Sequence, residues 1–458
     1  MGGYQGYAEY RDSGVEWLGE APKHWEIIPV GRLYRRVKRT GCTEKELLSV
    51  YRDYGVIPKY SRDDNNNKPS EDLSPYQLVK IDDLVMNKMK TWQGSIAISE
   101  YEGIVSPAYF VYPPLLRSNE LAYPRYIHYL LRSPVYIAQY LRRSKGIRVN
   151  QWDLDPAEFQ KVELLLPRKE EQNKIFNFLD HETAKIDTLI EKQKKLIALL
   201  KEKRQAVISH AVTKGLNPDV VMRDSGVEWL GEVPEGWDVM QIRRILPLME
   251  QGKSPECDNK VAGDNEWGVL KTSCVNNGVY NSAANKALPD HVEPFPQYEV
   301  KKDDVLMSRA SGSVDLIGSV ALVHETRNKI LLSDKVFRLH LDHQVNRVFF
   351  SFLMRSLYMR ANIERTISGA EGMANNITKS AVVGFKIAVP PLHEQQLIAD
   401  LISKKLYKFS GLIQKSECVI ALMQERRTAL ISSAVTGKID VRNWQAPLQT
   451  KPNTVDAA

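Results

Sequence analysis

Apolar side chains recur at helical spacing through two long segments of the chain, residues 171–212 and 394–435. The first segment contains no Gly or Pro, and the second is interrupted only by Gly411. A heptad frame places the apolar positions on one narrow seam, made of Ile175, Leu179, Ile186, Leu189, Leu196, Leu200 and Val207 in the first segment and of Ile398, Ile402, Phe409, Leu412, Val419, Met423 and Leu430 in the second. A helix of this length spans about 60 Å, and its seam is stable only when covered. We therefore expect the two helices to cover each other.

Shorter apolar patterns precede each long helix and predict a mixed α and β domain. The strands are expected in or near residues 47–50, 103–112 and 162–167 of the first half and residues 269–272, 330–340 and 385–390 of the second. The segments VKIDDLVM (79–86) and VKKDDVLM (300–307) are typical of a turn that enters a buried strand. Residues 124–143 and 347–365 have amphipathic helical spacing.

The chain contains one unit twice. Residues 11–20 and 223–232 both read RDSGVEWLGE, and a second block matches Glu171-Gln172 with Glu394-Gln395 at an offset of 223. The two RDSGVEWLGE blocks are separated by 212 positions, whereas the Glu-Gln pairs are separated by 223. The second copy therefore carries an insertion, placed near residues 250–264. Because each helix leaves its domain in the same sense, a pseudo-twofold arrangement pairs the helices antiparallel. The middles of the copies differ, which suggests one architecture reading two targets; neutral loop drift is the alternative.

These patterns predict an α+β protein in which two globular domains are joined by two long helices that form an antiparallel coiled coil. The expected boundaries are a first domain at 1–168, a first long helix at 169–214, a second domain at 215–391, a second long helix at 392–437 and a C-terminal tail at 438–458.

Composition narrows the class of protein. A formal net charge of +7 is mild, so only its local clustering bears on nucleic-acid binding. The four cysteines are scattered without metal-ligand spacing, so neither a disulfide framework nor a zinc site is expected. No apolar run approaches the roughly 20 residues of a bilayer span, and the N-terminus does not resemble a secretory signal. We expect a soluble, cytoplasmic protein.

Motifs of catalysis are missing from the sequence. It has no phosphate-binding GxxxxGK[ST] loop, no GxGxxG after a strand, and neither HExxH nor GxSxG. Pro289-Asp290 with Glu299-Val300-Lys301 matches the loose pattern of a Mg²⁺-dependent nuclease, but the pattern is short and the other copy has no counterpart. The sequence therefore predicts no catalytic residue, no metal and no cofactor.

Basic and polar residues gather instead where loops or helix faces are expected. Lys and Arg hold phosphates, whereas Asn, Gln and Ser side chains reach base edges. A Gly- and Ser-rich basic loop follows a strand at the same place in both copies, residues 88–95 and 309–313. The DNA-binding candidates are Arg35, Arg36, Arg62, Lys88, Lys90, Trp92, Gln93, Arg143, Arg148 and Asn150 in the first copy and Lys253, Lys271, Ser273, Arg309, Ser311, Ser313, Asn375 and Asn376 in the second.

WLGEAPKHWE (17–26) and WLGEVPEGWD (229–238), with LPRKEEQ and VPPLHEQ opening the long helices, resemble the specificity subunits of type I restriction–modification systems. The resemblance covers nearly the whole chain, twice over. The first copy departs from it at Arg168-Lys169, where the family has Pro-Leu before Glu-Gln.

The resemblance implies that each globular domain is a target recognition domain for one half of a bipartite double-stranded DNA site. It also implies that the helices set the gap between the halves and dock two modification (methyltransferase) subunits, which restriction subunits with an ATP-dependent motor and nuclease then join. The subunit itself would be non-catalytic. Two alternatives remain: a self-sufficient nuclease or methyltransferase, for which the two domains leave no room, and a helical scaffold whose globular ends bind protein.

Overall fold

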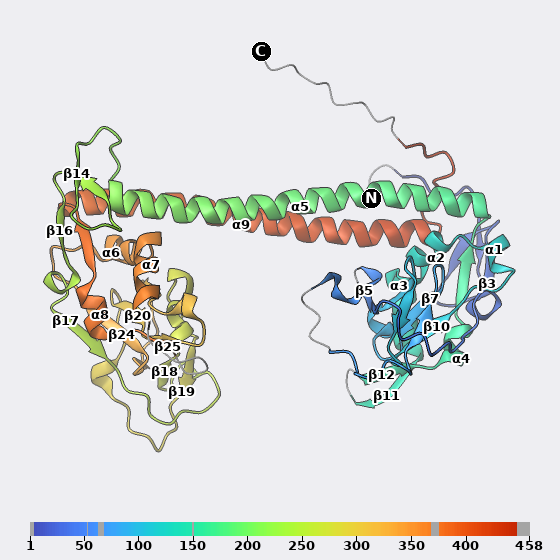
Figure 1. Ribbon diagram of the computed structural model, residues 1–458, viewed down its shortest axis with the longest axis horizontal. Coiled ribbons are helices and arrows are strands. Elements are labelled where there is room, and N and C mark those ends of the chain that lie inside the picture. Colours follow the sequence, from blue (N-terminus) through green and yellow to red (C-terminus); the bar gives the residue numbers. More distant parts are fainter. Residues whose placement is uncertain (1–3, 53, 63–67, 149–150, 368–374, 447–458) are drawn as a thin grey trace, which may run out of the picture. The chain divides into compact units, whose positions relative to one another are not determined.

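The computed structural model describes residues 4–52, 54–62, 68–148, 151–367 and 375–446 (Figure 1). The chain forms two compact units: unit 1 is Met1–Gln193 with Glu417–Ala458, and unit 2 is Lys194–Ser416. Both contain a mixed α and β domain together with part of each long helix, α5 (Lys169–Lys214) and α9 (Leu392–Val435). Among the described residues, no helix is long and apolar enough to cross a membrane.

The domain of unit 1 is built from short antiparallel strands. They are β1 (Tyr10–Asp12), β2 (Glu20–Pro22), β3 (Glu26–Pro29), β4 (Leu48–Tyr51), β5 (Gly55–Pro58), β6 (Gln77–Val79), β7 (Leu84–Asn87), β8 (Ile96–Ile98), β9 (Gly103–Val105), β10 (Tyr109–Tyr112), β11 (Ser144–Arg148), β12 (Gln151–Leu154) and β13 (Glu163–Leu166). Strand β7 lies between β10 and β8, and β1–β2, β3–β13, β4–β5, β6–β9 and β11–β12 form pairs. The helices are α1 (Ser118–Leu121), α2 (Pro124–Leu131), α3 (Pro134–Arg143) and α4 (Pro156–Gln160), with 3-10 turns η1 (Val30–Arg32), η2 (Lys59–Ser61) and η3 (Thr91–Gln93).

The domain of unit 2 repeats this plan with a larger central sheet. Its strands are β14 (Met222–Asp224), β15 (Glu232–Pro234), β16 (Asp238–Gln241), β17 (Leu248–Gln251), β18 (Gly268–Leu270), β19 (Asn285–Ala287), β20 (Val305–Ser308), β21 (Ala310–Ser311), β22 (Val320–Leu322), β23 (Ile330–Leu331), β24 (Val336–His340), β25 (Asn375–Asn376) and β26 (Lys386–Val389). The central order is β17-β24-β20-β22, and β18 pairs antiparallel with β19 and parallel with β23. The helices are α6 (Arg347–Met354), α7 (Leu357–Thr366) and α8 (Lys379–Gly384), with turns η4 (Ile242–Arg244), η5 (Thr272–Gly278), η6 (Pro296–Tyr298) and η7 (Val314–Leu316).

The paired aspartates form the same turn in both domains. Asp82 and Asp303 adopt positive φ angles of 67° and 68°. The carboxylates of Asp83 and Asp304 each accept a backbone hydrogen bond at 2.8 Å, from Lys80 and Lys301 respectively. Each turn leads into a buried central strand, β7 or β20, as the sequence predicts.

The amphipathic segments 124–143 and 347–365 are helical, as their spacing indicates, but each forms two helices. Both are broken in the middle, where Ser133 and Ser356 have extended backbones with ψ near 149° and 154°. In unit 1 the cause is Pro134, because proline disfavours helical geometry in the residue before it. The break leaves Arg132 and Arg355 at the ends of α2 and α6.

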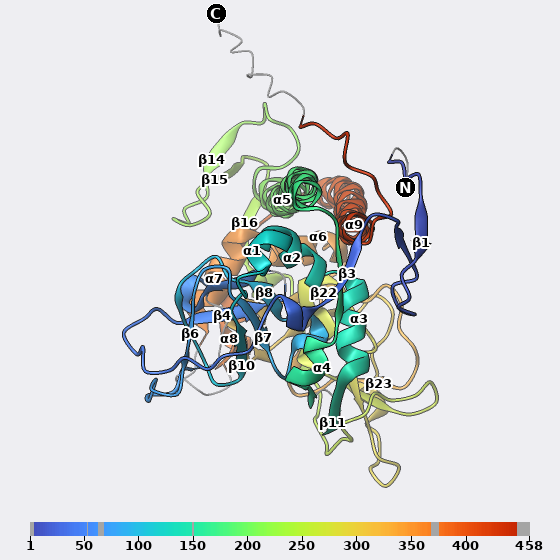
Figure 2. The ribbon, with the colours of Figure 1, turned by 90° about the vertical axis from the view of Figure 1, so that its right-hand side faces the viewer.

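The two long helices pair within each unit. In unit 1, Ile175, Leu179 and Ile186 of α5 pack in one core with Leu430 and Ala434 of α9. In unit 2, the core contains Ile208 and Val212 of α5 with Ile398 and Ile402 of α9. The pairing is antiparallel, since an ion pair of 2.9 Å joins Asp187 to Arg427 in unit 1 whereas Gly215 approaches Glu394 in unit 2. Figure 2 shows the unit 1 segments of α5 and α9 side by side above α2. The expected α+β fold with a helical coiled coil is confirmed.

The predicted seam is wrong in its middle. Leu189 and Leu196 of α5 are 45% and 42% exposed, and Leu412 of α9 is 48% exposed. The buried positions include Ile190 and Ile208, one residue beyond the heptad positions. A straight helix has 3.6 residues per turn, so its buried stripe drifts from a strict 3.5-residue repeat.

The repeated sequence blocks form the junction between each domain and its helix. The indole nitrogen of Trp25 donates a hydrogen bond of 3.1 Å to Glu171, and Trp237 donates one of 3.0 Å to Glu394. The next residue in each helix, Gln172 or Gln395, donates to the carbonyl of a proline at the end of the preceding strand, at 2.8 and 2.9 Å. The ends of the two copies are therefore alike because they build the same buried joint.

The departure at Arg168 does not alter the start of α5. The carbonyl of Arg168 accepts backbone hydrogen bonds of 2.9 Å from Glu171 and Gln172. Pro391 plays the same part at the start of α9, where it accepts from Glu394 and Gln395 at 2.9 and 3.0 Å. The backbone carbonyl, not the side chain, makes this cap.

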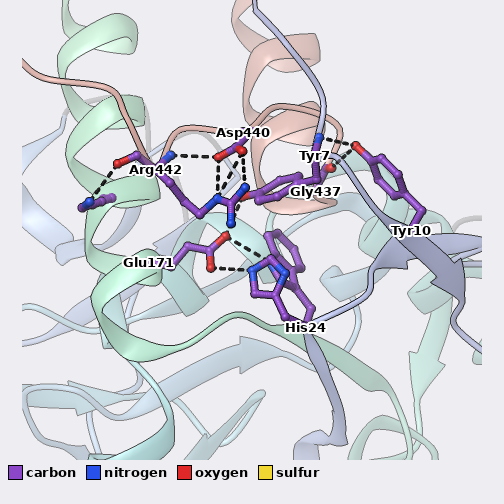
Figure 3. Close-up of polar contacts among 9 residues, drawn as sticks. Tyr7, Tyr10, His24, Glu171, Gly437, Asp440 and Arg442 are labelled. Atoms are coloured by element: carbon purple, nitrogen blue, oxygen red, sulfur yellow. Dashed lines mark hydrogen bonds and ion pairs between the residues drawn. The ribbon is translucent and has the colours of Figure 1, made fainter.

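In unit 1 the segment that follows α9 completes the joint (Figure 3). Tyr7 donates a hydrogen bond of 2.7 Å to Glu171, and the Arg442 guanidinium lies 5.1 Å above the Tyr7 ring. Burial, with the Glu171 carboxylate, raises the pKa of Tyr7 far above its usual value. Tyr10 donates a hydrogen bond of 2.9 Å to the carbonyl of Gly437. The beginning and the end of the described chain thus meet at one joint; residues 447–458 of the expected tail lie outside the described residues.

Candidate nucleic-acid interface

Two neighbouring turns of each domain carry or adjoin several of the candidate residues. In unit 1 they are the β4–β5 turn and the β7–β8 turn, which contains η3. In unit 2 they are η5 and the segment between β20 and β22. A Cβ at Gly94 would lie 3.8 Å from the side chain of Arg52, and η5 packs against β20 and β22, so the two turns are adjacent in both units. Strands β11 and β12 lie on the side of unit 1 away from its α5 segment (Figure 1).

Lys88 and Arg309 occupy equivalent positions in the two domains. The amide of Lys88 donates to the carbonyl of Ala108 at 3.1 Å, and its carbonyl accepts from the amide of Leu154 at 3.3 Å. Arg309 is held in the same way, donating to Lys335 at 2.8 Å and accepting from Ile377 at 2.9 Å. A backbone fixed on both sides gives each cation a defined starting point, which recognition requires.

The side chains around Lys88 and Arg309 differ between the two units. In unit 1, Trp92 packs against Trp152 of β12 with ring centroids 4.8 Å apart. The Trp92 indole nitrogen donates to the carbonyl of Met89 at 2.9 Å, so the pair presents mainly carbon atoms. Lys90 and Gln93 are exposed beside it. Apolar surface of this kind is suited to thymine methyl groups or to the walls of a groove.

Unit 2 has small polar side chains instead. Strand β21 pairs with β25, which places Ala310 opposite Asn376 and Ser311 opposite Asn375. The amide of the exposed Ser313 donates to the Ser311 hydroxyl at 3.2 Å. Amide and hydroxyl groups such as these form hydrogen bonds with base edges. Equivalent frames in the two units therefore present different chemistry.

Further candidate residues lie on or beside the second turn. In unit 1 the Arg62 guanidinium lies 4.3 Å above the ring of exposed Tyr54. In unit 2 the half-buried Lys271 precedes η5, and Ser273 is exposed on it.

The remaining candidates are less uniform. Arg35 and Arg36 are exposed, and the Arg36 guanidinium lies 4.0 Å from the centre of the Phe110 ring. Lys253 lies 4.5 Å above the ring of Phe295. Arg143 is paired with Glu163 at 3.4 Å, so its charge is already compensated. Arg148 belongs to β11, and Asn150 lies outside the described residues.

Sequence reasoning missed Trp152 and Tyr54 in this surface. Trp152 follows the candidate Asn150 closely and lies 223 positions before Asn375. That offset is the one found at the helix starts, so alignment of the copies would have placed Trp152 opposite a candidate residue. Tyr54 has no such signal, because its role depends on Arg62 folding back over it.

The nuclease-like motif does not form a metal site. The Glu299 carboxylate accepts the backbone amide of Lys329 at 2.7 Å. Over the part of the chain that the structure describes, no three His, Cys, Asp or Glu residues gather in a way that could hold a metal ion.

Comparison with known proteins finds similar sequences and a similar fold. Residues 234–417 match the family model of the type I restriction modification DNA specificity domain. The specificity subunit of the type I restriction enzyme EcoEI from Escherichia coli is 35% identical over 162 residues, which cover 35% of this chain and 27% of that subunit. The MjaVIII specificity subunit of Methanocaldococcus jannaschii is 22% identical over 92% of this chain and 94% of its own length. The EcoKI specificity subunit of Escherichia coli K12 is 22% identical over 93% of this chain and 92% of its own length.

Two solved structures share the fold. A chain from a structural study of complex assembly and conformational transition in a type I restriction–modification system aligns with a TM-score of 0.68 at 15% identity, over 92% of this chain and 99% of that one. The HsdS subunit of Thermoanaerobacter tengcongensis aligns with a TM-score of 0.51 at 15% identity, over 92% of this chain and 98% of that subunit. With the family model that covers most of unit 2, these likenesses make the chain similar, over nearly its whole length, to the specificity subunits of type I restriction–modification systems.

Proposed function

We propose that this chain is the non-catalytic, sequence-reading subunit of a type I restriction–modification complex. Its domains, residues 1–168 and 215–391, would each read one half of a bipartite site in double-stranded DNA. The observation that carries the proposal is the pair Lys88 and Arg309, two cations on equivalent backbone frames. The frames differ in what surrounds them: a tryptophan pair in unit 1, serine and asparagine in unit 2. Two frames with different side chains suit two different half-sites.

The same proposal assigns residues 169–214 and 392–437 to spacing and to partner binding. Leu189, Leu196 and Leu199 of α5 are exposed, as are Leu412 and Leu422 of α9. Large apolar side chains left exposed on a helix favour a protein partner. Two modification (methyltransferase) subunits would bind there and supply the chemistry, and restriction subunits with an ATP-dependent motor and nuclease would join them. A subunit with this role works in the cytoplasm, where the DNA is, and needs neither metal nor cofactor of its own.

The methylation pattern of host DNA, sequenced with and without this gene, tests the proposal. The expected result is one asymmetric bipartite motif that loses methylation when the chain is absent. Loss of no motif would contradict the proposal.

Affinity for duplex DNA as a function of salt separates this role from that of a protein-binding scaffold. Neutralising several phosphates gives a log–log slope of several units, about 0.9 for each phosphate. A flat response would exclude binding to the DNA backbone.

A further inference from the structure

Arg132 and Arg355 occupy equivalent positions in the two domains. Each is the residue that follows the first helix of a broken helical pair, α2 or α6, and each precedes a buried serine. They are separated by 223 positions, the offset found at the helix starts. Neither arginine belongs to the turns that carry the candidate DNA-binding residues.

In unit 1, Arg132 connects its helix to the β4–β5 turn. One of its Nη atoms lies 2.6 Å from the ring Nε2 of His128, one helical turn earlier. The other Nη donates a hydrogen bond to the backbone carbonyl of Arg52. Gly55, which closes the turn with a φ of +74°, faces the same guanidinium: a Cβ there would lie 3.3 Å from the Arg132 side chain.

In unit 2, Arg355 makes the equivalent connection to η5. Its Nη2 donates to the backbone carbonyl of Asn277 at 3.2 Å. Gly278, with a φ of +71°, lies against the guanidinium so closely that a Cβ would collide with it. The carbonyl of Arg355 in turn accepts a hydrogen bond of 2.6 Å from Gln205 of α5. Burial and the nearby Arg204 lower the pKa of Arg355 to about 10.

We infer that Arg132 and Arg355 are positioning residues for half-site recognition, each fixing the conformation of one recognition turn through a backbone carbonyl. The inference rests on the proposed function and goes beyond it, because it separates residues that hold the turn from residues that touch DNA. The planar guanidinium suits the task, since it offers several donors in a fixed geometry. The two turns differ, yet in both units an arginine donates to a backbone carbonyl of the turn and a glycine at positive φ lies against its guanidinium.

A direct contact with phosphate is the competing role for any arginine beside a DNA-binding surface. It makes a different prediction. Loss of a phosphate contact weakens binding to all sequences alike and reduces the salt slope by about one unit. Loss of a positioning residue relaxes base preference while the salt slope stays as it was.

The test uses the full-length chain, co-expressed with its methyltransferase subunits, to select duplexes from a random-sequence library. The variants are Arg132→Gln and Arg355→Gln, with Arg132→Lys and Arg355→Lys as conservative partners. Gly278→Ala pushes the Arg355 guanidinium away without removing it. Its matched control is Gly226→Ala, a position in the same unit with a φ of +66° and nothing within 4 Å. Thermal unfolding identifies variants that do not fold, and Gly278→Ala decides the question for unit 2 if Arg355→Gln is one of them.

The expected result is specific to one half-site in each case. Arg355→Gln and Gly278→Ala should reduce discrimination roughly tenfold at positions of one half-site, the scale of a good base contact. Arg132→Gln should do so in the other half-site, the lysine variants should lose less, and Gly226→Ala should lose nothing. Unchanged base preferences in folded variants would overturn the inference, as would uniform weakening with a shallower salt slope. If the unaltered chain selects no sequence, the proposed function itself fails.

Discussion

The carboxylate of Glu171 accepts a hydrogen bond of 3.1 Å from the indole nitrogen of Trp25. The same carboxylate accepts from Tyr7 at 2.7 Å and lies 2.8 Å from His24. Its counterpart Glu394 accepts from Trp237 at 3.0 Å, and no other side-chain donor within the described residues contacts it. We therefore expect Glu171→Ala to lower the free energy of unfolding by about 3 kcal/mol and Glu394→Ala by about 1–2 kcal/mol, because each buried donor left without an acceptor has a cost.

Urea denaturation followed by tryptophan fluorescence measures both changes. The two glutamates are matched controls for each other, since both lie in the first turn of a long helix beside an indole. Equal losses would mean that Tyr7 and His24 add nothing to the joint of unit 1.

Arg309→Met should relax base preference in one half-site only. Arg309 is half-buried on a backbone held at both its amide and its carbonyl, so its side chain reaches a defined place. Losing a well-placed arginine contact to a base costs about 1–3 kcal/mol. Selection from a randomised duplex library measures the change. Arg143→Met is the control, because Arg143 is already paired with Glu163 and should leave both half-sites as they are. Relaxation of both halves by Arg309→Met would contradict the assignment of one half to each domain.

The stability of unit 1 should fall in mild acid because of His128. Burial, with the neighbouring Arg132 charge, lowers the pKa of His128 to about 3. The ordinary value in an unfolded chain is about 6.5. Between these values the unfolded chain binds a proton that the folded chain does not, so the free energy of unfolding decreases as pH falls through this range. The expected decrease from pH 7 to pH 5 is about 2 kcal/mol.

His128→Ser is the matched variant, because Ser351 occupies the equivalent position in unit 2. It should remove this part of the pH dependence in denaturation measured at pH 7 and pH 5. A pH dependence that survives the substitution unchanged would assign it to other groups.

The sequence predicted what the two copies share and failed where contacts between distant residues decide. The paired tryptophans and the Glu-Gln pairs could be matched by offset alone, and they proved to be one joint built twice. The predicted heptad seam is wrong at Leu189, which is exposed. The sequence does not show where the buried stripe of a helix departs from a strict 3.5-residue repeat, because this depends on how the two helices pack. Arg143 was indistinguishable in sequence from its basic neighbours, and its compensation by Glu163 depends on the fold. Arg132 and Arg355 match at the repeat offset of 223, but the sequence did not show what they do, because each acts on a backbone carbonyl of a distant segment.

Lengthening both long helices together should change the spacing between half-sites without changing the bases read. Seven residues inserted after Gln193 of α5 and seven after Ser416 of α9 keep the apolar stripe in phase. They add about 10 Å of helix, which corresponds to about three base pairs of B-form DNA. The methylation motif of host DNA gives the spacing directly. Insertion in α5 alone is the control, and it should disturb the pairing of the helices and lower stability. New bases in either half-site of the doubly extended chain would refute the separation between domains that read and helices that measure.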